Sequence, residues 1–329
     1  MTNGDTDHSA YDYNPSKPAA WSFLGIFTLL FLVHAFQALK LRSLWAWPLI
    51  LGLFLEVLGF SMRYVSIITT IHSAKDVGPL VISQISIIVA PACIAAYLYM
   101  AVGRMMSFLG AEHSPVSHNI LTRIFVIADY VSISTQGNAA GLLSSESLMT
   151  IRVGAYIITV ALAFQVVLMM YFLYITIVFD TRSHRVLREK RKSIQPLFYC
   201  IYITTMLILL RSIYRLIEYA TIKYTTTGPS GYTVNTEWIL FAFDSGPVAV
   251  SCMILATIYP AQYLPHRKGL RIDGTYEEQK PSTRVWGFLW KRKQYRTIDN
   301  SKSATNQSFG IETGSQSVPL EDRMLDSYR

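Results

Sequence analysis

Charged residues interrupt several long apolar stretches of the sequence, and these are the side chains whose types could do chemistry. Four acids and three bases lie within such stretches: Glu56, Arg63, Asp129, Arg211, Arg215, Glu218 and Asp244. An eighth charged residue, Glu237, lies near the end of one stretch. Each would cost about 2.5–3.5 kcal/mol at the centre of a bilayer, so such residues usually face a bundle interior and mark function. Seven unpaired groups would cost on the order of 20 kcal/mol, which predicts pairing between helices.

The spacing of the polar residues places them on one face of each helix. Seven residues separate the members of five pairs: Glu56 and Arg63, Gln84 and Pro91, Asp129 and Gln136, Arg211 and Glu218, and Glu237 and Asp244. Seven residues is close to two helical turns, or about 10 Å along the axis. We therefore expect five helices to present a polar stripe to the interior. Arg215 is also expected to pair with Glu218, three residues on.

Two roles are open for these charged residues. Buried ion pairs can serve only to fix how helices pack, which suits Glu56 with Arg63 and Arg215 with Glu218. Asp129 and Asp244 have no basic residue one turn away on their own helices. They are the stronger candidates to contact a substrate or a proton.

The uncharged polar residues of the stripes favour simpler roles. Gln84 and Gln136 are more typical of hydrogen bonds between helices than of ligand contacts. Tyr97 and Tyr99 are expected to pack. Pro91 and Pro247, both within apolar stretches, are expected to kink their helices.

Only 15% of the residues are charged, against about 25% in a typical soluble domain. A spanning helix takes about 20 apolar residues. Seven segments qualify and predict an all-α integral membrane protein, a seven-transmembrane helix bundle: 19–39, 45–68, 80–106, 121–143, 153–179, 196–219 and 236–259. The segment 121–143 is the most polar, so other helices would have to surround it.

Basic residues are unevenly distributed between the two sides of this predicted bundle. Four lie in the N-terminal tail and the even-numbered loops, and thirteen lie in the odd-numbered loops and just after the last helix. This bias predicts an N-terminus outside and a C-terminus in the cytoplasm. The predicted organisation is an extracellular tail over 1–18, a transmembrane domain over 19–264, and a basic, mostly disordered cytoplasmic tail over 265–329.

Within the tail, residues 285–296 combine aromatic side chains with a basic run. Such a segment could anchor at the interface of a membrane that contains anionic lipid. A disordered tail without that role is the equal alternative.

The motifs of several other function classes are absent. The sequence has no P-loop, no HExxH and no GxSxG, and Cys93, Cys200 and Cys252 form no CxxC. We expect no metal, no cofactor and no enzymatic activity. The formal charge of +8 fits a basic cytoplasmic side and does not require nucleic acid as a partner.

Taken in order, five segments resemble the fungal lipid-translocating exporter family, seven-helix proteins linked to aminocholesterol resistance and sphingoid-base export. They are EVLGFSMR from Glu56, APACIAAYLYMAVGR from Ala90, FVIADYVSISTQ from Phe125, RSIYRLIE from Arg211 and EWILFAFD from Glu237. The resemblance covers about Tyr13 to Pro260. The chain departs from the family pattern at a few positions: Ala139, Ala140, Ala161 and Phe241.

The resemblance implies a plasma-membrane protein that translocates or exports amphiphiles and contributes to resistance against toxic lipids. The implied partners are membrane lipids, namely sphingoid bases, phospholipids or sterol-like amphiphiles, and in one branch of the family porphyrins. The polar stripe would shelter a head group while the acyl chain stays in the bilayer. Asp129, Asp244 and Glu237 would contact a cationic amine, and three arginines would contact a phosphate or balance the acids: Arg63, Arg211 and Arg215.

A seven-helix receptor or lipid sensor is the alternative. The predicted topology, the basic loop over 182–192 and the Ser- and Thr-rich tail suit signalling. Nothing in the sequence supplies energy for transport.

Overall fold

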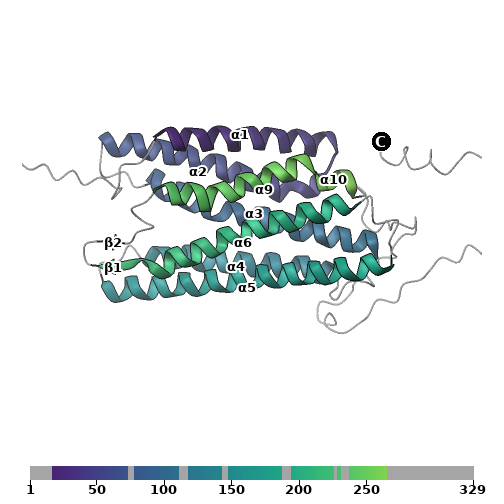
Figure 1. Cartoon of the computed structure of the whole chain (residues 1–329). Coiled ribbons are helices and arrows are strands. Elements are labelled where there is room, and N and C mark those ends of the chain that lie inside the picture. Colours follow the sequence, from purple (N-terminus) through teal and green to yellow (C-terminus); the bar gives the residue numbers. More distant parts are fainter. Residues whose placement is uncertain are drawn as a thin grey trace, which may run out of the picture.

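The computed structural model describes residues 17–72, 78–110, 118–142, 147–186, 194–225, 228–230 and 237–264. The predicted C-terminal tail, with its possible anchor at 285–296, and nearly all of the predicted N-terminal tail lie outside these residues. The long helices run side by side along one axis and form an elongated bundle (Figure 1).

A helix lies at each of the seven predicted positions. The first six are α1 (Lys17–Lys40), α2 (Trp47–His72), α3 (Gly78–Leu109), α4 (His118–Leu142), α5 (Leu148–Val186) and α6 (Gln195–Thr221). The last helical run is composed of α8 (Glu237–Ile239), the π-helix η4 (Leu240–Ser245) and α9 (Gly246–Thr257).

Short elements fill some of the connections. A 3-10 turn, η1 (Leu44–Ala46), precedes α2, and α10 (Pro260–Tyr263) follows α9. Between α6 and α8 the chain forms an antiparallel pair of strands, β1 (Lys223–Thr225) and β2 (Gly228–Ser230). The sequence patterns did not predict this pair.

Six segments of the described chain are long and apolar enough to cross a membrane: Pro18–Lys40, Trp47–Ile68, Gly78–Leu109, Leu148–His184, Gln195–Thr221 and Leu240–Tyr263. Helix α4 has the length of a span but not the apolar composition, because it contains Asp129 and a run of Ser, Thr, Gln and Asn residues. The protein is a multi-pass helical membrane protein with six candidate spans.

The helices are arranged with α3 and α6 in the middle of the bundle. Helices α1, α2 and α9 lie on one side of them, and α4 and α5 lie on the other (Figure 1). Large apolar side chains are exposed on the outer helices, as lipid contact requires; Phe36, Tyr156 and Val160 are examples. Six charged residues of the predicted stripes are buried in the described part of the chain: Glu56, Arg63, Asp129, Arg211, Glu218 and Asp244.

Helices α2 and α3 pack at very short range along a glycine face. A Cβ atom at Gly52 would lie 2.8 Å from the carbonyl oxygen of Ala90, and one at Gly59 would lie 2.7 Å from the Ile87 side chain. Small residues allow this kind of close helix packing inside a membrane. The contact fixes the position of Glu56, which lies between the two glycines on α2.

The two predicted kink prolines change the backbone hydrogen bonding of their helices. Proline has no N–H, so Pro91 cannot donate to the carbonyl of Ile87 four residues earlier in α3. Pro247 lies in the first turn of α9, directly after η4, where the N–H of Gly246 donates to the carbonyl of Phe241 five residues back. Such π-helical turns are rare and occur often at functional sites.

Candidate functional site

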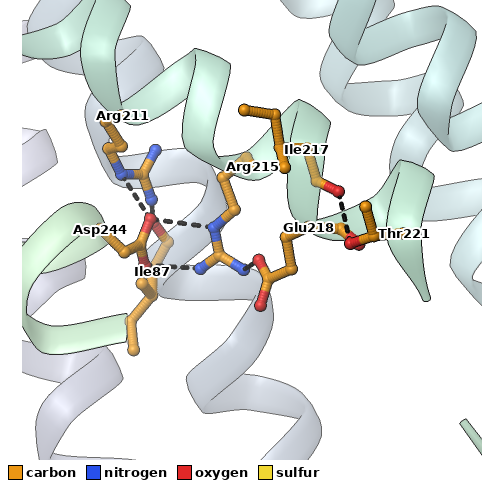
Figure 2. Close-up of polar contacts among 7 residues, drawn as sticks. All are labelled: Ile87, Arg211, Arg215, Ile217, Glu218, Thr221 and Asp244. Carbon is orange, nitrogen blue, oxygen red and sulfur yellow. Dashed lines mark hydrogen bonds and ion pairs between the residues drawn. The ribbon is translucent and has the colours of Figure 1, made fainter. Parts of the chain in front are cut away.

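An ionic cluster in the bundle interior joins α6 to η4, and Asp244 is its centre (Figure 2). Asp244 is fully buried. Arg215 donates to both of its carboxylate oxygens, from Nε to Oδ1 over 2.9 Å and from Nη2 to Oδ2 over 2.6 Å. Arg211 forms a second ion pair with it, with Nε 2.8 Å from Oδ1. Paired donors of this kind give a charge-assisted contact of defined geometry.

Arg211 also ties the cluster to α3. Its Nη2 donates to the carbonyl oxygen of Ile87 over 2.8 Å (Figure 2). This is the carbonyl that Pro91 leaves without a donor from within the helix. The guanidinium therefore satisfies a backbone group that would otherwise be unpaired and costly in an apolar interior.

Glu218 completes the cluster on α6. Arg215 donates from Nη1 to Glu218 Oε2 over 3.1 Å, which confirms the predicted pair three residues apart. Arg211, Arg215, Glu218 and Asp244 together carry two positive and two negative charges. These four residues, called the ionic cluster below, are balanced in charge and buried together.

Two residues of α2 lie beside the ionic cluster. Glu56 is 1% exposed and lies within electrostatic range of Arg211, Arg215 and Asp244. Arg63, equally buried, places its guanidinium carbon 5.7 Å from the centre of the Phe241 ring. The expected pairing of Glu56 with Arg63 along their own helix does not appear as a hydrogen bond to either Glu56 oxygen.

Asp129 belongs to a different polar group, between α3, α4 and α5. Its Oδ2 accepts a hydrogen bond from the hydroxyl of Tyr99 over 2.9 Å, and the Tyr99 ring packs edge-on against Phe172 of α5. Asp129 is buried, and no ion pair to it is found among the described residues. Of the two aspartates predicted to contact a substrate, Asp244 is thus ion-paired, whereas the bonded neighbour of Asp129 is neutral.

A row of hydrogen bonds continues from Asp129 along α4. Ser132 donates to the carbonyl of Ala161 over 2.9 Å, and the Gln136 amide donates to the Ser132 hydroxyl over 3.1 Å. The same amide lies 3.4 Å from the side-chain oxygen of Gln165 on α5. Gln136 therefore joins helices as predicted. Asp129, Ser132, Gln136 and Gln165 are called the α4–α5 polar row below.

A groove of about 450 Å³ lies between α4 and α5, and Ser132 is the residue of this row that lines it. Its lining is mostly apolar and is exposed toward the lipid side of the bundle: Val131, Tyr156, Ile157, Val160 and Phe164. Ser132 and Ala161, which are bonded to one another, also line it. The groove thus combines apolar walls with the hydroxyl of Ser132, one member of the α4–α5 polar row.

Two predicted site residues are not assigned to either group. Gln84 is half-buried in α3, and no hydrogen bond links it to the ionic cluster within the described chain. Glu237 is the first residue of α8, and its side chain lies outside what the structure describes. No cluster of three or more metal-ligating side chains occurs among the described residues.

Sequence reasoning missed two participants. Tyr99 was expected only to pack, although it is the hydrogen-bond donor to Asp129. The Ile87 carbonyl was not considered, although a proline four residues later is a readable signal of an unpaired carbonyl in a helix.

Comparisons with known proteins place the chain in a family. It is 29% identical to Protein RTM1 of Saccharomyces cerevisiae over 69% of this chain and 72% of that protein. It is 27% identical to Protoporphyrin uptake protein 1 of the same species, over 75% of this chain and 91% of that protein. Identity to the Lipid-translocating exporter-like protein RTA1 of Leptosphaeria maculans is 24%, over 82% of this chain and 55% of that protein.

No solved structure matches the chain significantly. The family model described as RTA1-like protein matches residues 49–267, which include both the ionic cluster and the α4–α5 polar row. This match confirms the family resemblance drawn from the motifs. The chain belongs to the RTA1-like protein family.

Proposed function

We propose that the protein translocates amphiphilic lipid across the membrane, or exports toxic amphiphiles such as sphingoid bases or sterol-like compounds. The observation that carries this proposal is the buried, charge-balanced ionic cluster in a family with a member named as a lipid-translocating exporter. Charged groups at bilayer depth mark substrate or ion pathways in membrane proteins.

The ionic cluster has the chemistry to exchange partners with a zwitterionic or cationic head group. An amine could replace a guanidinium at Asp244, and a phosphate could accept from Arg211 or Arg215. The cluster joins the middle helices α3 and α6 to the η4–α9 segment, so exchange of these bonds would loosen contacts between helices. This couples head-group binding to movement of the last helical run.

The groove between α4 and α5 suits the apolar part of the same substrate. Apolar walls facing the lipid side can hold an acyl chain, and Ser132 of the α4–α5 polar row, which lines the groove, offers a hydrogen bond to hydroxyl or amine groups. Asp129, which is buried three residues before the groove-lining Ser132, would be the acceptor for a cationic amine that passes beyond the groove, since its bonded partner Tyr99 is neutral.

The proposal includes the topology of the bundle. Helix α4 would be a seventh span, shielded from lipid on its polar side by α3 and α5, with the N-terminus outside and the C-terminus in the cytoplasm. The bias of basic residues supports this orientation. The plasma membrane is the proposed location, and anionic lipid is the proposed partner of the 285–296 segment.

The test is a vesicle assay with purified protein and a fluorescent sphingoid base. Wild-type protein should move the probe across the bilayer, and Asp129→Asn and Asp244→Asn should each slow it by roughly tenfold or more per folded molecule, the equivalent of about 1.4 kcal/mol in a barrier. Asp180→Asn, at the end of α5, removes the same charge away from both polar groups and should move lipid as wild type does.

Each outcome bears on one part of the proposal. Equal rates in wild type and in both interior variants would overturn the site assignment. Absence of any movement with well-folded wild-type protein, across a panel of lipids, would overturn translocation and favour a lipid sensor.

A further inference from the structure

Glu56 stands out among the charged residues of the interior. It is 1% exposed, and neither carboxylate oxygen has a hydrogen-bond partner among the described residues. Every other acid of the described interior has a donor: Asp244 has Arg211 and Arg215, Glu218 has Arg215, and Asp129 has Tyr99. Glu56 is a buried carboxyl without hydrogen-bond donors, and the arginines within its electrostatic range, Arg211 and Arg215, are ion-paired with Asp244.

The ionic cluster near Glu56 is balanced in charge without it. Arg211 and Arg215 are matched by Asp244 and Glu218, so an ionised Glu56 would add an uncompensated negative charge to this cluster. A buried ion without hydrogen bonds is strongly unfavourable in a low-dielectric interior, and such a group binds a proton instead. The neutral acid needs no counter-charge.

We propose that Glu56 is a proton-binding site, protonated in this arrangement of the helices, and that its proton is exchanged for the positive charge of the transported amphiphile. The second half of this proposal rests on the proposed function. When a cationic amine takes the place of Arg211 or Arg215 at Asp244, the released guanidinium lies within electrostatic range of Glu56. The carboxyl then loses its proton to water and pairs with that guanidinium.

The exchange conserves charge. One positive charge enters the interior with the amine, and one leaves as the proton, so the interior stays neutral throughout. The energy source implied is a proton gradient across the membrane, which requires no nucleotide site on the chain.

Charged and titratable groups of three other elements lie within electrostatic range of Glu56 and bear on its protonation. They are Arg211 and Arg215 of α6, Asp244 of η4 and Cys252 of α9. His34 of α1 is bonded through Nε2 to the Cys252 carbonyl over 3.0 Å. On its own helix, Arg63 lies two turns further along, against Phe241.

The first test needs no lipid movement. Infrared spectra of the purified full-length protein in detergent should show the carbonyl band of a protonated carboxylic acid that is absent in Glu56→Gln and retained in Glu218→Gln. Glutamine resembles the neutral acid in size and charge, so Glu56→Gln should unfold at the wild-type temperature. Glu218→Gln breaks the ion pair with Arg215 and should unfold at a lower temperature.

These measurements can overturn the proposal in two ways. A wild-type spectrum that Glu56→Gln leaves unchanged would show that Glu56 is ionised. A loss of stability in Glu56→Gln as large as that in Glu218→Gln, including a failure to fold, would also show that Glu56 is ionised.

The second test addresses exchange and uses proteoliposomes with a pH-sensitive dye inside. Movement of a cationic sphingoid base should be accompanied by proton movement in the opposite direction, and an imposed pH gradient should drive the lipid. Lipid movement without proton movement would overturn the exchange, although lipid translocation itself would stand. Absence of lipid movement would instead refute the proposed function, and the infrared result would still decide the protonation of Glu56.

Discussion

The guanidinium of Arg211 donates to the backbone carbonyl of Ile87 over 2.8 Å, in the position that a helical N–H would occupy if residue 91 were not proline. The missing backbone N–H of Pro91 in α3 and the charged side chain of Arg211 in α6 are thus parts of one arrangement. The same guanidinium pairs with Asp244, so a single side chain connects α3, α6 and η4. Arginine suits this role because its planar fork can serve two acceptors at once.

Replacement of Arg211 by lysine should destabilise the protein although the charge is kept. A single ammonium can pair with Asp244 but cannot also reproduce the fork that reaches Ile87, so we expect a loss of about 1.5–3 kcal/mol in the free energy of unfolding. Thermal unfolding in detergent micelles measures it. Arg182→Lys, at an exposed position of α5, is the matched control and should change stability by less than about 0.5 kcal/mol. Equal effects of the two substitutions would contradict the double role of Arg211.

Asp244→Asn should be among the most destabilising single substitutions in the bundle. It leaves Arg211 and Arg215 buried without their shared counter-charge, and breaking a buried ion pair in this way costs about 3–5 kcal/mol. A double-mutant cycle with Arg215→Met should give a total loss well below the sum of the two single losses. Asp129→Asn combined with Arg215→Met should be additive, because no ion pair joins these residues. Additivity in the first cycle would refute the central position of Asp244.

Two tyrosines of α3 allow a matched comparison. Tyr97 and Tyr99 are both fully buried, but only the Tyr99 hydroxyl has a hydrogen-bond partner among the described residues. Tyr99→Phe should cost about 1–3 kcal/mol, because it leaves the Asp129 carboxyl without its donor. Tyr97→Phe removes a buried hydroxyl without a partner and should leave the unfolding temperature unchanged or raise it. The reverse order of unfolding temperatures would exclude the Tyr99–Asp129 bond.

The close packing of α2 on α3 predicts that a side chain at position 52 destabilises the protein. An added Cβ would lie 2.8 Å from the backbone oxygen of Ala90, which cannot rotate away, so Gly52→Ala should cost about 1–3 kcal/mol. Gly25→Ala, in an open position of α1, should be neutral or stabilising by up to about 1 kcal/mol, because alanine favours the helix. The difference between the two unfolding temperatures is the measurement. A Gly52→Ala protein as stable as the Gly25→Ala protein would argue against the short helix distance.

The positions of the helices could be predicted well from sequence, because apolar length decides them. The interval of three residues between Arg215 and Glu218 also predicted their bond, since both lie on one helix. The partners of Asp244 and Asp129 were not predictable in this way. They lie on other helices, and spacing along one helix contains no information about the depth and rotation of its neighbours.

For α4, by contrast, the polar composition of the helix did predict part of its packing. The sequence predicted a span that other helices must surround. The structure buries Asp129 and Gln136 against α3 and α5, but Tyr130 and Asn138 of the same helix are exposed, so other helices cover α4 only in part. The groove beside it depends on how far α4 and α5 separate at Val160 and Phe164, which is a property of packed surfaces. No pattern in the chain encodes such a separation locally.

The composition of α4 also has a consequence for biogenesis. A helix with a buried carboxylate and a row of amide and hydroxyl groups is a poor substrate for insertion into lipid by itself. Its acceptors and donors are matched by Tyr99 of the preceding helix and by Gln165 and Ala161 of the following one. If α4 is the seventh span proposed above, α3, α4 and α5 would therefore enter the bilayer as one unit, and insertion of α4 would be completed only after α5 had been synthesised.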